Sequence, residues 1–201
     1  LQNSRGMKVE TIRAYRDGFK SHMQSRAFGE QIFKWECQDN FQKNWNIEEL
    51  DFGSMYDRSL SHPETGRLWG GSHQSAKSVM MQFIQLNREF VRSMFRDLFS
   101  ESKDLVMRIE RFQFHCDQLL TELNATHQKI NHHFHQDLYM PLLYLTLRYP
   151  QRYCIYDRDI FVKSLELIFA KDPQSTTLER FMKVIKIYQS QLLQDEEITS
   201  V

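Results

Sequence analysis

Apolar side chains recur at every third or fourth position through almost the whole chain, and this spacing constrains the fold more than any other feature. It is the spacing of one face of an α-helix, and it is clearest over residues 90–99 and 105–123. Strand-type alternation never extends beyond five residues, and only 7 glycines and 4 prolines interrupt the 201 residues. The sequence therefore predicts an all-α fold, a single compact multi-helix domain of about eight or nine helices.

Capping residues predict where several of these helices begin. Short polar side chains that accept hydrogen bonds from free backbone N–H groups precede the apolar runs, at Ser75, Asn87, Ser102, Asp137 and Asp157. Pro141 would lie in the first turn of its helix, where a missing N–H costs little, and Pro150 would end that helix. Earlier helices are expected over 8–24, 28–45 and 47–60, and a last one over 177–194. The run 152–156 is the only one that could be extended.

The termini divide the chain into three expected segments. Residues 1–6 precede Met7 and have the character of an expression scar. Residues 7–195 would form the single helical domain, and residues 196–201 a tail or linker toward a missing motor domain. The one Gly/Pro-rich connection lies at 61–73.

Charge and cysteine content limit the classes of function. Lys plus Arg and Asp plus Glu both number 26, so nothing attracts the whole chain to nucleic acid or acidic lipid, and any such binding needs a local patch. The three cysteines lie far apart, which favours a reducing compartment over a disulfide framework. No apolar run approaches 18 residues and no signal pattern begins the chain. We therefore expect a cytoplasmic protein without membrane contact.

Residues 71–78, "GSHQSAKS", match a nucleotide-binding P-loop except that Ala76 replaces the second glycine. No apolar strand precedes the loop, and no apolar strand ending in an acid follows it to hold Mg²⁺. We therefore interpret it as a turn in which Ser72 or Ser75 caps a helix and Lys77 is solvated. Weak anion binding at the helix start remains an alternative.

Four histidines lie within residues 127–135, "HQKINHHFH". Imidazoles can bind zinc or nickel, but no clean i, i+4 pair is present, so a polar turn between two helices is the favoured interpretation. Asp137 lies nearby in sequence, and Cys116 and His115 on the preceding helix could approach.

Arginines recur four residues apart at Arg88, Arg92 and Arg96, which places them on one helix face. Further cations follow at Lys103, Arg108 and Arg111. Such a row could bind phosphates, but acids are interleaved with it, at Glu89, Asp97, Glu101, Asp104 and Glu110. A solvated mixed-charge face or an intramolecular salt-bridge seam is the commoner outcome.

No catalytic constellation is found, because no nucleophile elbow is present and Cys116 lies on an apolar face. We expect no catalytic residue, no metal and no cofactor. If DNA is bound, the expected contacts are mainly to phosphates, from Arg88, Arg92, Arg96, Arg67, Lys77 and Trp69. A loop tryptophan can stack on a base, although a buried anchor for the loop is the more common role.

Four stretches together resemble the N-terminal region of McrB-type AAA+ proteins, the NTPase subunits of modification-dependent (type IV) restriction systems. They span about residues 30–170 and read "FKWECQDNFQKNWN" (33–46), "LWGGSHQSAKSVMMQFI" (68–84), "FVRSMFRDLFSESKDLVMRIERF" (90–112) and "LYLTLRYPQRYCIYD" (143–157).

The resemblance implies an isolated N-terminal domain, because the P-loop and Mg²⁺-binding acid of that family's motor are not in this chain. Such domains commonly select the target, often modified DNA, while the motor and a partner nuclease act. Modified-base readers of this kind often use β-rich folds that flip a base into an aromatic cage, and a helical sequence departs from that.

We therefore expect a non-catalytic recognition domain that binds DNA or a protein that reports invasion. The alternative is a protein-interaction or assembly module whose last helix packs against the motor or another subunit. A small metal-dependent enzyme is a third, weaker alternative.

Overall fold

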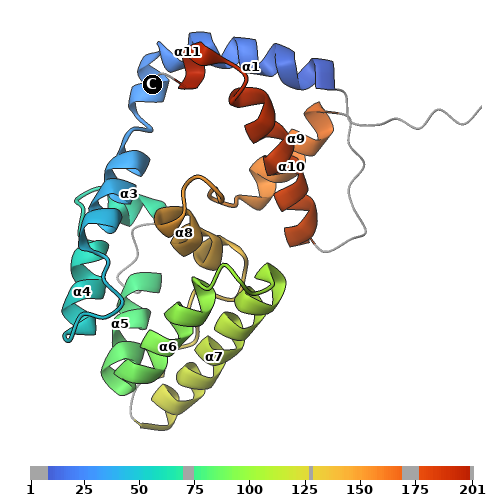
Figure 1. Cartoon of the computed structure of the whole chain (residues 1–201). Helices are drawn as coiled ribbons and strands as arrows, with labels where there is room; N and C mark the ends of the chain where they lie inside the picture. The colour runs from blue at the N-terminus through green and yellow to red at the C-terminus, as the bar shows by residue number, and fades with distance from the viewer. Residues whose placement is uncertain (1–8, 70–74, 127–128, 169–176, 200–201) are drawn as a thin grey trace, which may run out of the picture. The chain divides into compact units, whose positions relative to one another are not determined.

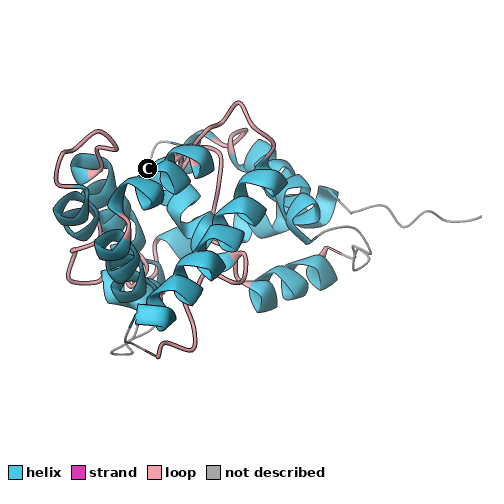
Figure 2. Ribbon diagram, turned by 90° about the horizontal axis from the view of Figure 1, so that it is seen from below, coloured by secondary structure: helices cyan, strands magenta, loops and turns pink. Residues whose placement is uncertain are grey.

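The computed structural model describes residues 9–69, 75–126, 129–168 and 177–199, and within them all regular secondary structure is helical. In these ranges nine helices have at least seven residues, which confirms the predicted fold class and helix number. Figures 1 and 2 show the arrangement of the helices within the chain. No strand occurs in these ranges, and the segment 152–156 is a loop. No helix in the described part of the chain combines the length and apolarity needed to cross a bilayer.

The sequence predicts one domain, whereas the structure divides into two compact units. Unit 1 combines residues 1–32 with residues 156–201, and unit 2 comprises residues 33–155. The arginine row, the glycine-rich connection and the histidine cluster all lie in unit 2.

Unit 2 contains six α-helices and one 3₁₀ turn. They are α3 (Phe33–Asn44), α4 (Phe52–Ser59), η1 (Thr65–Leu68), α5 (Ala76–Leu86), α6 (Arg88–Leu98), α7 (Leu105–Thr126) and α8 (Tyr139–Arg148). Helix α3 packs against α4 and α8, and α5 packs against α4, α6 and α7. Helices α6 and α7 run side by side (Figure 1).

Local capping chemistry accounts for most helix starts. Ser75 and Ser78 form a reciprocal capping box at α5, and the side chains of Asn87 and Asp157 accept backbone hydrogen bonds at the starts of α6 and α9. These three predictions are confirmed. Helix α8 ends at Arg148, before Pro150, as expected.

Four predicted boundaries differ in the structure. At α8 the N-cap position is Leu138 rather than Asp137, whose carboxylate instead accepts a hydrogen bond from the N–H of Tyr139. Helix α7 begins at Leu105, and it is Asp104 rather than Ser102 whose carboxylate accepts a hydrogen bond, from the N–H of Met107. Helix α4 begins at Phe52, later than the predicted start at Ile47, because Asp51 caps it. The predicted helix over 28–45 is divided into the short α2 (Arg26–Gly29) and α3.

The core of unit 2 is rich in aromatic rings. Phe95 lies at its centre, with Tyr144 at 5.1 Å and Phe112 at 5.3 Å between ring centroids, both edge-to-face. Trp45 stacks on Phe41 at 4.8 Å. Edge-to-face pairs of this kind contribute about 0.5–1.5 kcal/mol each beyond the area they bury.

Unit 1 is built on the contact of α1 (Val9–Met23) with α10 (Thr177–Leu192). It also contains α2, α9 (Arg158–Leu167) and α11 (Glu196–Thr199), the last lying in the segment predicted as a tail. Phe181 packs edge-to-face on Tyr156 and Phe161. Lys20 pairs with Asp195 at 2.7 Å.

Candidate functional site

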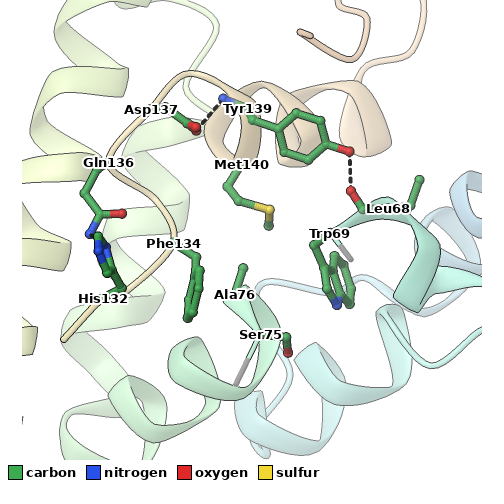
Figure 3. A pocket seen from close by; sticks show the side chains of 10 residues that line it. All are labelled: Leu68, Trp69, Ser75, Ala76, His132, Phe134, Gln136, Asp137, Tyr139 and Met140. Atoms are coloured by element: carbon green, nitrogen blue, oxygen red, sulfur yellow. Dashed lines mark hydrogen bonds between the residues drawn. The ribbon is translucent and has the colours of Figure 1, made fainter. Parts of the chain in front are cut away.

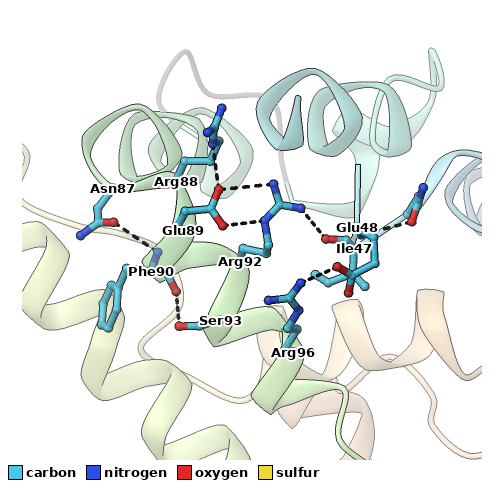
Figure 4. Close-up of polar contacts among 10 residues, drawn as sticks. Ile47, Glu48, Asn87, Arg88, Glu89, Phe90, Arg92, Ser93 and Arg96 are labelled. Carbon is cyan, nitrogen blue, oxygen red and sulfur yellow. Dashed lines mark hydrogen bonds and ion pairs between the residues drawn. The ribbon is translucent and has the colours of Figure 1, made fainter. Parts of the chain in front are cut away.

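Arg92, the middle residue of the arginine row, is buried, with 5% of its surface exposed. Its guanidinium donates to the Glu89 carboxylate at 3.0 Å and to the backbone carbonyl of Ile47 (Figure 4). It also lies over the ring of Phe52. This arginine therefore ties α6 to the loop before α4. Its predicted contact with phosphate would require these bonds to break.

Arg88 and Arg96 are about half exposed, and each forms an ion pair with a carboxylate that is itself mostly exposed. Arg88 pairs with Glu89 at 3.0 Å, and Arg96 pairs with Glu48 at 2.6 Å (Figure 4). Exposed pairs of this kind contribute only about 0–1 kcal/mol. These two guanidinium groups could therefore exchange a carboxylate for a phosphate at little cost.

The cations on α7 and in the turn before it also have internal partners. Lys103 and Arg111 both pair with Asp97, and Arg108 pairs with Glu101 at 2.8 Å. These ion pairs are those of an intramolecular salt-bridge seam, which the sequence offered as an alternative to phosphate binding. Asp97 and Glu101 carry depressed pKa values. Partial burial raises each pKa, and hydrogen bonds lower it by more, from Arg111 and Lys103 to Asp97 and from Arg152, Arg108 and Tyr153 to Glu101.

The sequence predicts a solvated Lys77, and this prediction is wrong. The side chain is mostly buried, with 18% of its surface exposed. Its ammonium pairs with Asp57 at 2.7 Å and donates to the carbonyl of Leu60 and the hydroxyl of Ser61. It therefore connects the start of α5 to the end of α4. Ser72 and Gly71 of the same motif lie outside the described residues.

Arg67 and Trp69 flank the end of η1. Arg67 is exposed, stacks over the ring of Phe33 at 3.9 Å and pairs with Glu64 at 2.8 Å. Trp69 is half-buried and lines a surface pocket of about 600 Å³. Of the six residues predicted to bind nucleic acid, Trp69 alone lines this pocket (Figure 3).

The Trp69 pocket, as we call it, is formed by η1, the start of α5 and the loop before α8. Its lining residues are Leu68, Trp69, Ser75, Ala76, His132, Phe134, Gln136, Asp137, Tyr139 and Met140. In Figure 3 the rings of Trp69 and Phe134 flank Ala76, and Tyr139 donates its hydroxyl to the carbonyl of Leu68. The pocket therefore offers several aromatic faces together with a few polar groups, the combination typical of ligand sites.

Sequence reasoning missed the contribution of Phe134 and Tyr139. The aromatic residue between two histidines was a signal, but only the fold brings residues 132–140 beside Trp69.

The histidine cluster is divided between the surface and the core. His132 is exposed, whereas His133 and His135 are completely buried, and His127 lies outside the described residues. Cys116 does approach the cluster, as the sequence allowed. His115 instead lies against the ring of Phe90 and hydrogen-bonds to Gln118.

A chain of hydrogen bonds crosses the buried part of the cluster. Tyr56 and Tyr144 share a hydroxyl–hydroxyl bond of 2.8 Å, and the Tyr144 hydroxyl lies 3.1 Å from Nε2 of His135. Burial, reinforced by the neighbouring His133, lowers the pKa of His135 to about 3. Burial raises the pKa of the Cys116 thiol far above its ordinary value. As a free thiol, Cys116 is therefore a poor nucleophile.

Comparison with protein families, with curated proteins and with solved structures finds nothing that matches this chain.

Proposed function

We propose that this chain is a non-catalytic recognition module that holds its ligand in the Trp69 pocket. The observation that carries the proposal is the concentration of aromatic side chains around a pocket of about 600 Å³. Aromatic faces provide a large contact area at a low cost in conformational entropy, and for that reason they are enriched at binding surfaces.

The ion pairing of the predicted phosphate-binding cations favours a protein over nucleic acid as the ligand. Every predicted phosphate-binding cation pairs with a carboxylate of its own unit, and Arg92 and Lys77 are largely buried in doing so. The residues that line the Trp69 pocket include no Lys or Arg, so the pocket suits an apolar or aromatic side chain of a protein better than a phosphate backbone.

DNA is the second candidate, and the exposure of Arg88 and Arg96 supports it. Their ion pairs are the ones most easily exchanged for phosphates. In this version a base would stack on Trp69. Trp69 and the two arginines all belong to unit 2.

The resemblance to McrB-type proteins supports a place for the module in phage defence. In that setting the chain would recognise DNA or an invasion-reporting protein in the cytoplasm, while a motor domain and a partner nuclease subunit act. An assembly role, in which α10 packs against the motor or another subunit, is the competing proposal.

Selection from a random peptide library displayed on phage, with the purified chain as bait, tests the protein-ligand proposal. We expect enriched peptides rich in aromatic or aliphatic residues, and at least a tenfold loss of affinity in Trp69→Ala. Trp35→Ala is the matched control, because Trp35 is 52% exposed on α3 and does not line the Trp69 pocket. No enrichment, or equal losses in the two variants, would refute it.

Fluorescence anisotropy with labelled single- and double-stranded DNA tests the second candidate. If DNA is the ligand, affinity falls steeply with salt and is lost in the double variant Arg88→Ala/Arg96→Ala. Absence of binding at low salt would eliminate DNA. An assembly module predicts no DNA binding and a solution mass above that of one chain.

A further inference from the structure

Three metal-ligating side chains meet inside unit 2. The sulfur of Cys116 and one ring nitrogen each of His133 and His135 all lie within 4.8 Å of one another. All three residues have 0% of their surface exposed. Cys116 comes from the middle of α7, and both histidines come from the loop that precedes α8.

The partners of the two imidazoles define which ring nitrogen can bind an ion. The carboxylate of Asp117 can only accept, so Nε2 of His133 donates to it across 2.9 Å, and Nδ1 of His133 carries the lone pair. The backbone carbonyl of His133 can likewise only accept, so Nδ1 of His135 donates to it, and Nε2 of His135 carries the lone pair.

These contacts reproduce the usual outer shell of a metal-bound histidine. Such a histidine donates its second N–H to a carboxylate or to a backbone carbonyl, which fixes the ring and raises its basicity as a ligand. Both imidazoles of this cluster have that partner already in place. The lone pairs now accept weaker bonds, from the backbone N–H of His135 and from the hydroxyl of Tyr144.

The backbone is strained at Phe134, the residue between the two buried histidines. Phe134 has a φ of 64°, the only positive φ of a non-glycine residue in the described chain. That conformation costs a bulky residue about 1–3 kcal/mol and marks functional positions more often than others. Here it accompanies two buried imidazoles that flank an exposed phenylalanine ring.

We propose that Cys116, His133 and His135 together bind one zinc ion. Thiolate and imidazole are the donors that zinc prefers. Binding releases the Cys116 proton to solvent and forms a zinc–sulfur bond, with no change of oxidation state. It also compensates the burial of three polar groups.

The geometry requires a modest contraction. Zinc–nitrogen bonds near 2.0 Å and zinc–sulfur bonds near 2.3 Å place a tetrahedral sulfur and two nitrogens about 3.3–3.6 Å apart, so a pair of ligand atoms separated by 4.8 Å would have to approach by about 1.2–1.5 Å. The hydroxyl of Tyr144, 3.1 Å from Nε2 of His135, is a candidate for the fourth position, and Tyr56 can keep its hydrogen bond to that hydroxyl. The ion would stabilise the loop that carries His132 and Phe134 to the Trp69 pocket, yet the inference does not depend on what that pocket binds.

Metal analysis of the purified 201-residue chain, with any affinity tag removed, tests the site. After chelation and readdition of ZnCl₂, we expect about one zinc per chain and a midpoint of thermal unfolding that rises with zinc concentration. X-ray absorption at the zinc edge should show one sulfur ligand among nitrogen and oxygen neighbours. This measurement needs no variant and therefore remains decisive if the variants fail to fold.

Cobalt substitution identifies the sulfur. Co²⁺ should give a thiolate charge-transfer band that is absent in Cys116→Ser and unchanged in Cys154→Ser. His132→Ala, which removes an exposed histidine of the same loop, should leave the binding of zinc and cobalt intact. Zinc below one tenth of an equivalent, zinc bound without a sulfur neighbour, or a cobalt band that survives in Cys116→Ser would each overturn the proposal.

Discussion

The two units use similar helical patterns to build interiors of different character. Unit 2 encloses its polar groups: Arg92, Arg108, His133 and His135 are all buried and hydrogen-bonded among aromatic rings. In unit 1 a pocket of about 230 Å³ lies between the facing helices α1 and α10, whereas the larger Trp69 pocket of unit 2 lies at helix ends and a loop. Apolar spacing therefore predicts a buried helix face but not how completely a neighbouring helix covers it.

The polar contacts differ in number rather than in exposure. Glu101 of unit 2 receives hydrogen bonds from Arg108, Arg152 and Tyr153 at 2.6–2.8 Å. Asp195 of unit 1 is the more buried carboxylate, with 8% of its side chain exposed against 22% for Glu101, but it has one short ion pair, with Lys20 at 2.7 Å, and a longer one, with Arg16 at 3.5 Å. We therefore expect substitutions in unit 2 to have the larger effects on stability.

Truncation of the central ring of unit 2 should have the largest effect. Phe95→Ala removes a fully buried ring that touches at least five other aromatic side chains, and such changes cost about 3–5 kcal/mol. Urea denaturation followed by circular dichroism measures the loss. Phe181→Ala is the counterpart in unit 1, where hydrogen exchange should show the destabilisation confined to that unit. Equal global losses from both variants would contradict the comparison.

Removal of the Glu101 charge should come next, and its effect should depend on pH. Partial burial raises the pKa of Glu101, but the hydrogen bonds from Arg152, Arg108 and Tyr153 lower it by more, so the net pKa is below its ordinary value. Because the folded pKa lies below the unfolded value, the stabilisation is complete above about pH 5 and is lost as pH falls through the folded pKa. Glu101→Gln should cost about 1–3 kcal/mol at pH 7.

The pH dependence provides the check on this prediction. Urea denaturation of wild type and Glu101→Gln should give free energies of unfolding that converge as the pH is lowered from 5 toward 3. A difference that persists unchanged at pH 3 would show that the carboxylate charge is not the source.

Arg92 is buried, whereas Arg88 on the same helix is exposed, so substitution of the two arginines should affect stability differently. Arg92→Met should cost about 1–2 kcal/mol, because the carbonyl of Ile47 loses its donor and Glu89 loses a partner. Arg88→Met, on the same helix but 55% exposed at its side chain, should stay within about 0.5 kcal/mol. Thermal unfolding of the two variants makes the comparison. Indistinguishable midpoints would mean that the buried contacts of Arg92 contribute nothing.

The ion pairs of unit 1 should give the smallest effect. The hydrogen bond from Lys20 lowers the pKa of Asp195, so its contribution is present above the unfolded pKa and disappears as pH falls through the folded one. Asp195→Asn should lower the unfolding midpoint less than Glu101→Gln does at pH 7, and high salt should weaken the Asp195 contribution more. A larger loss in unit 1 would reverse the comparison.

Local chemistry made the helices predictable. Ser75, Asn87 and Asp157 cap the helices that the sequence assigns to them, because a capping side chain satisfies N–H groups only three residues away. Ser102 failed for the same reason, since Asp104 lies nearer the first turn and competes for the same donors.

The burial of each charged or polar side chain, and the partner it bonds to, were harder to predict from the sequence. Arg92 and Arg88 occupy equivalent positions in a repeating pattern, yet one is buried and the other exposed, because the carbonyl of Ile47 approaches only one of them. Trp69 could be recognised as a candidate from its loop, but six of the nine other residues that line its pocket come from a segment more than 60 residues away. The residue pattern of a single helix does not indicate which distant segment of the chain will pack against it.

The sequence by itself determined an all-helical chain, most of its capping residues and the absence of a complete P-loop motif, since these depend on residues within a turn or two of one another. Only the tertiary structure decided that Cys116 meets His133 and His135 and that Lys77 is held by Asp57. The physical reason is that burial and partner choice are set by contacts between distant segments, whose free energies of packing decide which polar groups leave water.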